Sequence, residues 1–361
     1  MLSAVRALPF LIACVASFKC KDQNNKDVDW FAVYKMPLLK DSSVAGVNDG
    51  YAFYYIDERN KYFTPSQVPI NENNQSIAYT LEQYYRSQQD SNVFHVMYND
   101  EPAEMTSTAR LFVNKMGSSG RRAASAQFGH TKGVAFFDRQ SGIWLVHSIP
   151  KFPPPNAYQY PESATQYGQS ILCITMKYSE LSKLGTLLYY NHPNIYSSSL
   201  PTQMAAENVD LQNAISGKYH RKSPFYHIAD LVSAGGHHFK AFAKTKKFDK
   251  DLYDGLVAPQ LSIPLTVETW RRGMEVPLEC NAKFIVLDVQ YVKVGRTKRF
   301  KSTKDHSKFA ISSDREQPFV CIGDINRMRS QYVRGGGTVC VKDTLLWKAY
   351  YDVIVNTNTC N

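Results

Sequence analysis

Apolar residues along the chain fall into short continuous runs separated by polar loops, and several runs are rich in β-branched and aromatic residues. Runs of this length and composition are typical of buried strands. They predict strands over residues 30–35, 51–56, 93–98, 143–147, 171–175 and 284–294.

Elsewhere, apolar residues recur three and four positions apart, which is the spacing of one helix face. This spacing predicts helices over residues 178–190, 202–215 and 343–354. Strands and helices mixed along the chain indicate an α/β fold. A polar stretch with Ser and Pro, residues 197–203, is the best candidate for a join between two halves.

One further apolar run, in FGHTKGVAFFD (residues 128–138), begins just after a histidine and a lysine. Residues two apart on a strand point to the same face, so His130 and Lys132 are expected to lie side by side. A lone histidine of this kind is more often structural than catalytic.

The same pattern recurs 176 residues later, which makes a purely structural histidine a poorer explanation. HTKGVAFFDR (130–139) aligns with HSKFAISSDR (306–315). The aligned pairs are His130 with His306, Lys132 with Lys308, Asp138 with Asp314 and Arg139 with Arg315. Such repetition suggests two half-domains that each supply half of one site.

Composition is that of an ordinary globular protein: 361 residues, of which 43% are hydrophobic and 20% charged. The formal net charge is +10, and basic residues concentrate in 240–250 and 293–308. Basic runs often form solvated surface, but the second one leads directly into the second motif. It could therefore attract a polyanion to the site, with Arg299, Lys301 and Lys304 as candidate contacts.

The N-terminus has a lone Arg6 followed by an apolar run over residues 7–16, which is too short to span a bilayer. It predicts a secretory signal peptide, residues 1–17, cleaved around residues 16–18. No later segment has the length of a transmembrane helix, so we expect a soluble protein that is secreted or delivered to an acidic compartment. No retention signal is recognised, which favours secretion.

Cysteine usage agrees with an oxidising compartment. Cys14 leaves with the signal, and the six remaining cysteines allow up to three disulfides in 15 possible pairings. No Cys-x-x-Cys pair exists and the histidines are scattered, so we expect no zinc site. Asn74 begins a glycosylation sequon in a polar loop.

Two His-x-Lys pairs suit phosphodiester cleavage, which needs a nucleophile, an acid for the leaving oxygen and cations for the non-bridging oxygens. One neutral histidine can attack while the other, protonated, donates. The lysines Lys132 and Lys308 supply positive charge without a metal. Attack by imidazole gives a phosphohistidine that water then hydrolyses. Because an unperturbed histidine titrates near pH ~6.5, we expect an acidic optimum.

The duplicated motif resembles that of the phospholipase D superfamily, and IGDINRMRSQ (322–331) is similar to its Gly-Ser-x-Asn continuation. Within it, nearly the whole chain resembles deoxyribonuclease II, the acid endonuclease. The similar blocks are VDWFAVYKMP (28–37), FGHTKGV (128–134), GIWLVHSIPKFP (142–153), FAKTKKFDKDLY (242–253), VETW (267–270), DHSKFAISS (305–313), CIGDINR (321–327) and RGGGTVC (334–340).

This resemblance implies an α/β fold of two phospholipase-D-like halves, residues 18–200 and 201–361, related by a pseudo-two-fold axis, with mixed sheets flanked by helices. It implies cleavage of DNA, with neither metal nor other cofactor, to 3′-phosphate and 5′-hydroxyl ends. His130 is the expected nucleophile and His306 the expected general acid. Asn326 is expected to bind phosphate or orient a catalytic group. The implied disulfides are Cys20–Cys173, Cys280–Cys360 and Cys321–Cys340.

The sequence also departs from the superfamily pattern. Five residues, not four, separate each motif lysine from Asp138 or Asp314, which favours a role for these residues in starting turns. Phe309 stands where the family often has Trp, and Asp324 occupies the Ser position. Two alternatives stay open: an inactive secreted protein that binds DNA or a host partner, and a hydrolase of RNA or lipid phosphodiesters. The sequence also leaves a homodimer possible and indicates no membrane partner.

Overall fold

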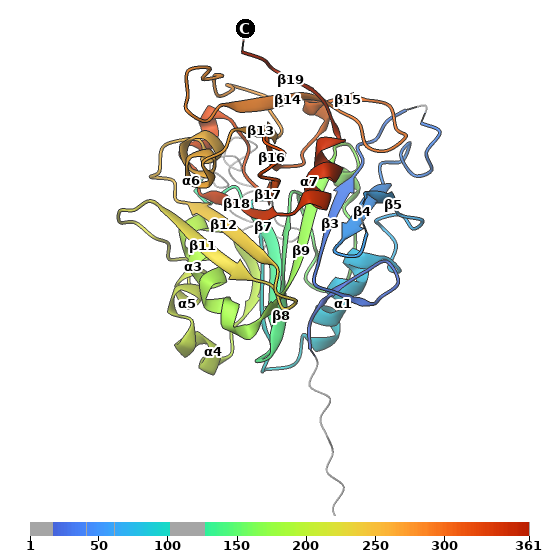
Figure 1. Cartoon of the computed structure of the whole chain (residues 1–361). Helices are drawn as coiled ribbons and strands as arrows, with labels where there is room; N and C mark the ends of the chain where they lie inside the picture. The colour runs from blue at the N-terminus through green and yellow to red at the C-terminus, as the bar shows by residue number, and fades with distance from the viewer. Residues whose placement is uncertain (1–16, 41, 61, 102–126, 361) are drawn as a thin grey trace, which may run out of the picture.

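The computed structural model describes residues 17–40, 42–60, 62–101 and 127–360, and it contains two large β-sheets with helices between and around them (Figure 1). The predicted mixed α/β class is confirmed. Residues 1–16 of the predicted signal peptide, with Cys14, lie outside the described residues.

The first sheet has eight strands among the described residues and is built from the N-terminal part of the chain. Its strands, in spatial order, are β10 (Ile195–Ser199), β6 (Phe94–Asn99), β7 (Lys132–Phe137), β8 (Ser141–His147), β9 (Gln169–Lys177), β3 (Trp30–Lys35), β4 (Phe53–Asp57) and β5 (Thr64–Pro65).

The second sheet is built from the C-terminal part of the chain, and some strands that are neighbours in this sheet are far apart in sequence. In spatial order the strands are β11 (Tyr226–Val232), β12 (His238–Lys244), β18 (Gly336–Lys342), β17 (Phe319–Gly323), β16 (Phe309–Ser312), β13 (Leu265–Glu268), β14 (Val286–Val292) and β15 (Phe300–Lys301). β19 (Ile354–Thr357) pairs with β14, and β1 (Cys20–Lys21) pairs with β2 (Asp27–Val28) in a separate ladder.

Helices are short. The α-helices are α1 (Ser76–Ser87), α3 (Leu181–Asn191), α4 (Thr202–Glu207), α5 (Val209–Ile215), α6 (Ala258–Leu261) and α7 (Thr344–Tyr351). Single turns of other helix types are η1 (Glu162–Ala164), η2 (Tyr178–Glu180), η3 (Tyr253–Val257), η4 (Ser302–Lys304) and η5 (Arg329–Gln331). None of these helices, within the described part of the chain, has the length and apolar character that crossing a membrane requires.

The central strands are buried on both faces, which explains why the sequence shows continuous apolar runs instead of alternation. Along β3, Ala32 and Tyr34 join the core shared by both sheets, while Phe31 and Val33 face a separate core beneath α1. The shared core includes residues of α3 and α7 as well as of both sheets, so the sheets and these helices are packed as one unit.

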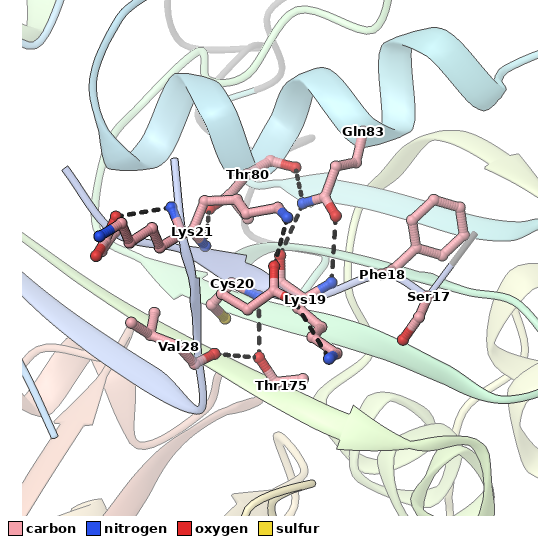
Figure 2. Close-up of polar contacts among 12 residues, drawn as sticks. Ser17, Phe18, Lys19, Cys20, Lys21, Val28, Thr80, Gln83 and Thr175 are labelled. Carbon is pink, nitrogen blue, oxygen red and sulfur yellow. Dashed lines mark hydrogen bonds and ion pairs between the residues drawn. The ribbon is translucent and has the colours of Figure 1, made fainter. Parts of the chain in front are cut away.

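The first described residues are fixed to the first sheet and to α1 by paired hydrogen bonds (Figure 2). The Lys19 amide donates to the Gln83 side chain (3.2 Å), and the Gln83 amide donates back to the Lys19 carbonyl (2.7 Å). The Thr175 hydroxyl accepts from the Cys20 amide at 2.9 Å and donates to the Val28 carbonyl at 2.7 Å. These contacts place Cys20 opposite β9.

The described part of the chain contains three disulfides, with the pairings that the family resemblance implies. Cys20–Cys173 ties the N-terminal segment to β9, and Cys280–Cys360 ties the C-terminal segment to the loop before β14. Cys321–Cys340 joins directly opposed residues of β17 and β18.

All six predicted strands are present, with ends shifted by at most two residues, but two helix predictions were partly wrong. The helix predicted over 202–215 is interrupted at Asn208, whose side-chain amide donates to the Met204 carbonyl (2.8 Å) and competes with helix propagation. The helix predicted over 343–354 ends at Tyr351, because the β-branched residues that follow join β19.

The stretch predicted to join two halves, residues 197–203, was also partly wrong. Ser197 to Ser199 belong to β10, which pairs with β6 in the first sheet. The chain leaves the first sheet only after this strand, through α4 and α5. β10 lies at a sheet edge and is only partly buried, so it contains exposed serines and lacks the apolar run that predicts a strand.

The disulfides differ in the length of chain that each one closes, so their removal is expected to have unequal effects. Replacing both cysteines of Cys20–Cys173, separated by 153 residues, is expected to lower the free energy of unfolding by about 5 kcal/mol on loop entropy alone. Replacing Cys321–Cys340, separated by 19 residues, is expected to cost about 3 kcal/mol. Denaturant unfolding of the two double-alanine variants measures both; a larger loss for Cys321–Cys340 would contradict the entropic account.

Candidate active site

Both His-x-Lys motifs stand at the start of a central strand. Lys132 is the first residue of β7, and Lys308 directly precedes β16. In each case the histidine lies two residues earlier, at the end of the sheet where the loops before β9 and β18 also arrive. The motif strands lie near the middle of the molecule (Figure 1).

The first motif is organised around the buried carboxylate of Asp100, which follows β6. Lys132 Nζ donates a hydrogen bond to Asp100 Oδ1, and His130 Nε2 lies 3.5 Å from Asp100 Oδ2. His130 Nδ1 is 2.6 Å from the carbonyl oxygen of Asp324. Because a carbonyl only accepts, Nδ1 carries the hydrogen, and the neutral ring then has its lone pair on Nε2.

Charges around the first motif compensate one another. Burial raises the pKa of Asp100, but Lys132, His130 and Arg334 outweigh it, so the pKa is lowered. Burial lowers the pKa of His130 well below its usual value, and the positive charges of Lys132 and Arg334 act in the same direction. Asp100 opposes this effect. In the resting site the first motif therefore combines a neutral imidazole with an ionised lysine–aspartate pair.

The second motif has an aromatic setting. The His306 ring stacks on Tyr167, with centroids 4.1 Å apart and planes within 6°, and it contacts the Trp270 ring at 4.3 Å. Its Nε2 is buried and makes no hydrogen bond within the described residues. Burial and the charge of Lys308 lower the pKa of His306 to about 2. The ring is thus held in place by stacking, while Nε2 has no hydrogen-bond partner among the described residues.

The two motifs act electrostatically as one site. The charge of Lys132 lowers the pKa of His306 and, after the larger effect of burial, helps to bring the pKa of Lys308 to about 7. Side chains also cross between the sheets. The Thr131 hydroxyl donates to the carboxylate of Asp324, and the Lys308 amide donates to the Ser170 hydroxyl at 3.1 Å.

The four other residues predicted to contact substrate do not lie together: one is buried, two line a pocket and one is exposed outside that pocket. Asn326 is buried, and its Oδ1 has no hydrogen-bond partner among the described residues. Arg299 and Lys304 line a pocket of about 480 Å³, whereas Lys301 is exposed and does not line it. The complete lining is Leu38, Leu39, Lys40, Gln166, Tyr167, Arg272, Lys298, Arg299 and Lys304. Through Tyr167 this basic pocket adjoins His306.

Three further sequence interpretations concern positions outside the motifs. Asp138 and Asp314 start turns, as predicted: Asp138 accepts from the Ser141 amide (2.8 Å) and Asp314 from the Glu316 amide (2.9 Å). Asn74 is exposed directly before the cap of α1, so its side chain is accessible. Among the described residues, no group of three or more His, Cys, Asp or Glu side chains is arranged to hold a metal ion.

From the sequence, no role in the site was assigned to several residues that build it. Asp324, Arg334 and Trp270 lie inside blocks that carry the family resemblance, so those blocks were the available signal. Asp100 and Tyr167 lie in loops without periodicity. Their proximity to the histidines follows only from the packing of the chain.

The Lys132–Asp100 pair generates a stability prediction. Asp100→Asn leaves a buried ammonium without its counter-ion and is expected to lower the free energy of unfolding by about 3 kcal/mol at pH 7. Because the folded pKa of Asp100 lies below its ordinary value of 3.8, the stabilisation is fully present above that pH and is lost as pH falls through the lowered pKa. Chemical denaturation is expected to give a constant loss from pH 4 to 7, and measurements below pH 3.8 test the decline of that loss.

Asp27→Asn is the matched control, because Asp27 pairs with Lys19 and Lys21 at the surface. Exposed pairs contribute about 1 kcal/mol or less. An equal loss in the two variants would contradict a special role for the buried pair.

Comparison with known proteins agrees with this site. The family model for deoxyribonuclease II matches residues 19–360. The chain is 52% identical to deoxyribonuclease-2 of Caenorhabditis elegans over 99% of both chains. It is 36% identical to plancitoxin-1 of Acanthaster planci, covering 97% of this chain and 94% of that protein, and 32% identical to mouse (Mus musculus) deoxyribonuclease-2-alpha, covering 95% and 94%. The chain therefore belongs to the deoxyribonuclease II family of nucleases.

Proposed function

We propose that the protein is an acid endonuclease that hydrolyses DNA without a metal ion and leaves 3′-phosphate and 5′-hydroxyl ends. The observation that carries the proposal is the convergence of two His-x-Lys motifs from different sheets on one site, in a chain of the deoxyribonuclease II family. The two histidines have different surroundings, which supports different roles for them.

In the first step, His130 is the nucleophile. Its Nδ1 hydrogen is held by the Asp324 carbonyl, so the lone pair on Nε2 attacks phosphorus while the bond to the 5′ oxygen breaks. The ring becomes positively charged in the phosphohistidine, and the Asp100 carboxylate 3.5 Å from Nε2 stabilises that charge. Protonated His306 donates its Nε2 proton to the leaving 5′ oxygen.

In the second step, water attacks the phosphohistidine. His306, now neutral, accepts a proton from that water on Nε2, and the bond between phosphorus and His130 Nε2 breaks. The electron pair returns to Nε2, and the product is a 3′-phosphate. Lys132 and Lys308 stabilise charge on the non-bridging oxygens. Asn326, whose side chain is buried with an unpartnered oxygen, is the further candidate for binding phosphate.

The basic pocket supports a path for the DNA backbone to the site. Arg299 and Lys304 contribute positive charge at its wall, and Lys301 adds to the charge of the same run. Phosphate contacts of this kind position a nucleic acid strand without reading its sequence. The binding energy is therefore expected to fall with salt.

We further propose that the chain consists of two phospholipase-D-like halves, residues 18–200 and 201–361, related by a pseudo-two-fold axis. The order β6-β7-β8-β9 in one sheet and β13-β16-β17-β18 in the other supports this, because both sets are antiparallel and each is followed by a helix, α3 or α7. Export through a signal peptide, to the outside or to lysosomes, stays a prediction, as does dimerisation.

The primary test is cleavage of plasmid DNA in EDTA at pH 4 to 8. Wild-type protein is expected to nick the plasmid with an acid optimum, and His130→Ala and His306→Ala are each expected to lose at least about 1000-fold in rate. His238→Ala, an exposed histidine on β12, is the control and is expected to be unaffected. End-labelling identifies the product ends, and RNA and phospholipid serve as competing substrates.

A folded, disulfide-intact wild type that fails to cleave any of these would move the protein to the class of DNA-binding or host-interacting proteins. Cleavage that EDTA abolishes would contradict the metal-independent mechanism.

The pH dependence of kcat/KM gives a second test, because this ratio reports the free enzyme. The pKa of His306 in the free enzyme is about 2, so this histidine is neutral above pH 4 and must take up one proton when substrate binds. The value of log(kcat/KM) is therefore expected to fall by about one per pH unit between pH 4 and 6.5. Above pH 7 the slope is expected to steepen, because Lys308, whose pKa burial and Lys132 lower to about 7, loses its charge.

Lys308→Arg keeps a positive charge at every pH in this range. Its profile is expected to lack the steeper limb above pH 7, whatever its overall rate. The same limb in the variant would show that Lys308 does not titrate there.

A further inference from the structure

Two buried lysines outside the catalytic motifs occupy matching places in the two sheets. Lys35 is the last residue of β3, which pairs with β9, and Lys244 is the last residue of β12, which pairs with β18. Both are 0% exposed. A buried ammonium is unfavourable unless all its hydrogens are bonded, so each needs a specific set of acceptors.

Each lysine finds three backbone carbonyls in one loop. Lys35 Nζ donates to the carbonyls of Ala164 (2.7 Å), Thr165 (2.7 Å) and Tyr167 (2.8 Å). Three donors meet three acceptors, which is the full capacity of an ammonium group. We refer to residues 164–168 as the first loop; it precedes β9.

Lys244 makes the corresponding contacts with a second loop, residues 331–335, which precedes β18. Its Nζ donates to the carbonyls of Gln331 (2.9 Å), Tyr332 (3.0 Å) and Arg334 (2.7 Å). Neither lysine forms an ion pair with a carboxylate among the described residues. In both sheets the lysine therefore acts on the shape of a loop and neutralises no side chain.

Each loop ends at the histidine of the opposite sheet. The first loop places the Gly168 carbonyl 2.8 Å from the His306 amide and stacks the Tyr167 ring on the His306 ring. The second loop places the Gly335 carbonyl 2.8 Å from the His130 amide. Arg334 of the second loop also donates to the Gly129 carbonyl (3.1 Å), next to His130.

Gly168 of the first loop and Gly335 of the second loop show how closely each loop packs against its neighbours. A Cβ atom on Gly168 would lie 2.3 Å from Asp305 Oδ1, and one on Gly335 would lie 2.2 Å from the Asn191 carbonyl oxygen. Neither position has room for a side chain. The loops are therefore packed directly against segments that carry or adjoin the opposite motif.

We propose that Lys35 and Lys244 are positioning residues that act across the two sheets: Lys35 orients His306 through the first loop, and Lys244 orients His130 through the second loop. The inference rests on the proposed function, in which His306 is the acid and His130 the nucleophile. It predicts that loss of Lys35 impairs the general acid and that loss of Lys244 impairs the nucleophile, although each lysine donates to three loop carbonyls.

The test uses Lys35→Met and Lys244→Met, which keep side-chain length but remove the ammonium group. The substrates are a short DNA duplex and the same duplex with sulfur replacing the 5′ bridging oxygen at one position. A sulfur leaving group departs as a thiolate and needs little protonation, so it bypasses the general acid but still requires the nucleophile.

On ordinary DNA both variants are expected to lose about 10- to 100-fold in kcat, the effect of a misplacement on the order of 1 Å, with KM changed less than about twofold. On the sulfur substrate Lys35→Met is expected to recover most of its rate, as His306→Ala does. Lys244→Met is expected to stay slow, as His130→Ala does. Lys183→Met removes a half-exposed lysine on α3 that contacts Glu180 and Asp230, and it is expected to match wild type.

If the sulfur substrate rescues both lysine variants, or neither of them, the inference is overturned. Rescue of His306→Ala in the same experiment still supports the proposed function. Failure of the sulfur substrate to rescue His306→Ala overturns the acid role itself, and an inactive wild type overturns both. If a methionine variant does not fold, Lys35→Gln and Lys244→Gln, which keep one donor group, replace it. Misfolding of these as well would overturn positioning in favour of a purely structural role.

Discussion

The burial of positive charge at one end of the two sheets is the constraint on which the site depends. Lys132 and Lys308 stand close enough for the charge of the first to lower the pKa of the second. Like charges in a region of low dielectric repel strongly, so the fold must supply compensating groups. Asp100 provides an ionised partner for Lys132, while the His306 carbonyl accepts a hydrogen bond from Lys308 Nζ.

A site compensated in this way favours the arrival of another anion. Burial lowers the pKa values of both histidines most, and the nearby positive charges lower them further. In the proposed mechanism, a bound phosphodiester would offset the second effect and so favour protonation of His306. The basic pocket beside Tyr167 extends the same field to the surface. In the proposed mechanism, the same lysines therefore couple substrate binding to protonation of His306.

How much the sequence predicted depended on whether the relevant contacts were local. Strands buried on both faces leave continuous apolar runs, so all six were found, and the repeat located both motifs. The break at Asn208 depends on a local side-chain hydrogen bond, and the strand β19 depends on pairing with β14; apolar periodicity encodes neither. Asp100 and Tyr167 reach the histidines from loops, so only the packed structure could reveal them.

Asp324 and His147 are both buried, but their contributions to stability change with pH in opposite directions. Burial raises the pKa of Asp324 to about 6, so its contribution is full below its ordinary pKa of 3.8 and is lost as pH rises through 6. Burial lowers the pKa of His147 to about 3, so its contribution is full above 6.5 and is lost as pH falls through 3. Between pH 4 and 6 the two trends oppose each other. The same burial that sets the chemistry of the site therefore gives these two groups partly cancelling contributions across the acidic range in which that chemistry is proposed to operate.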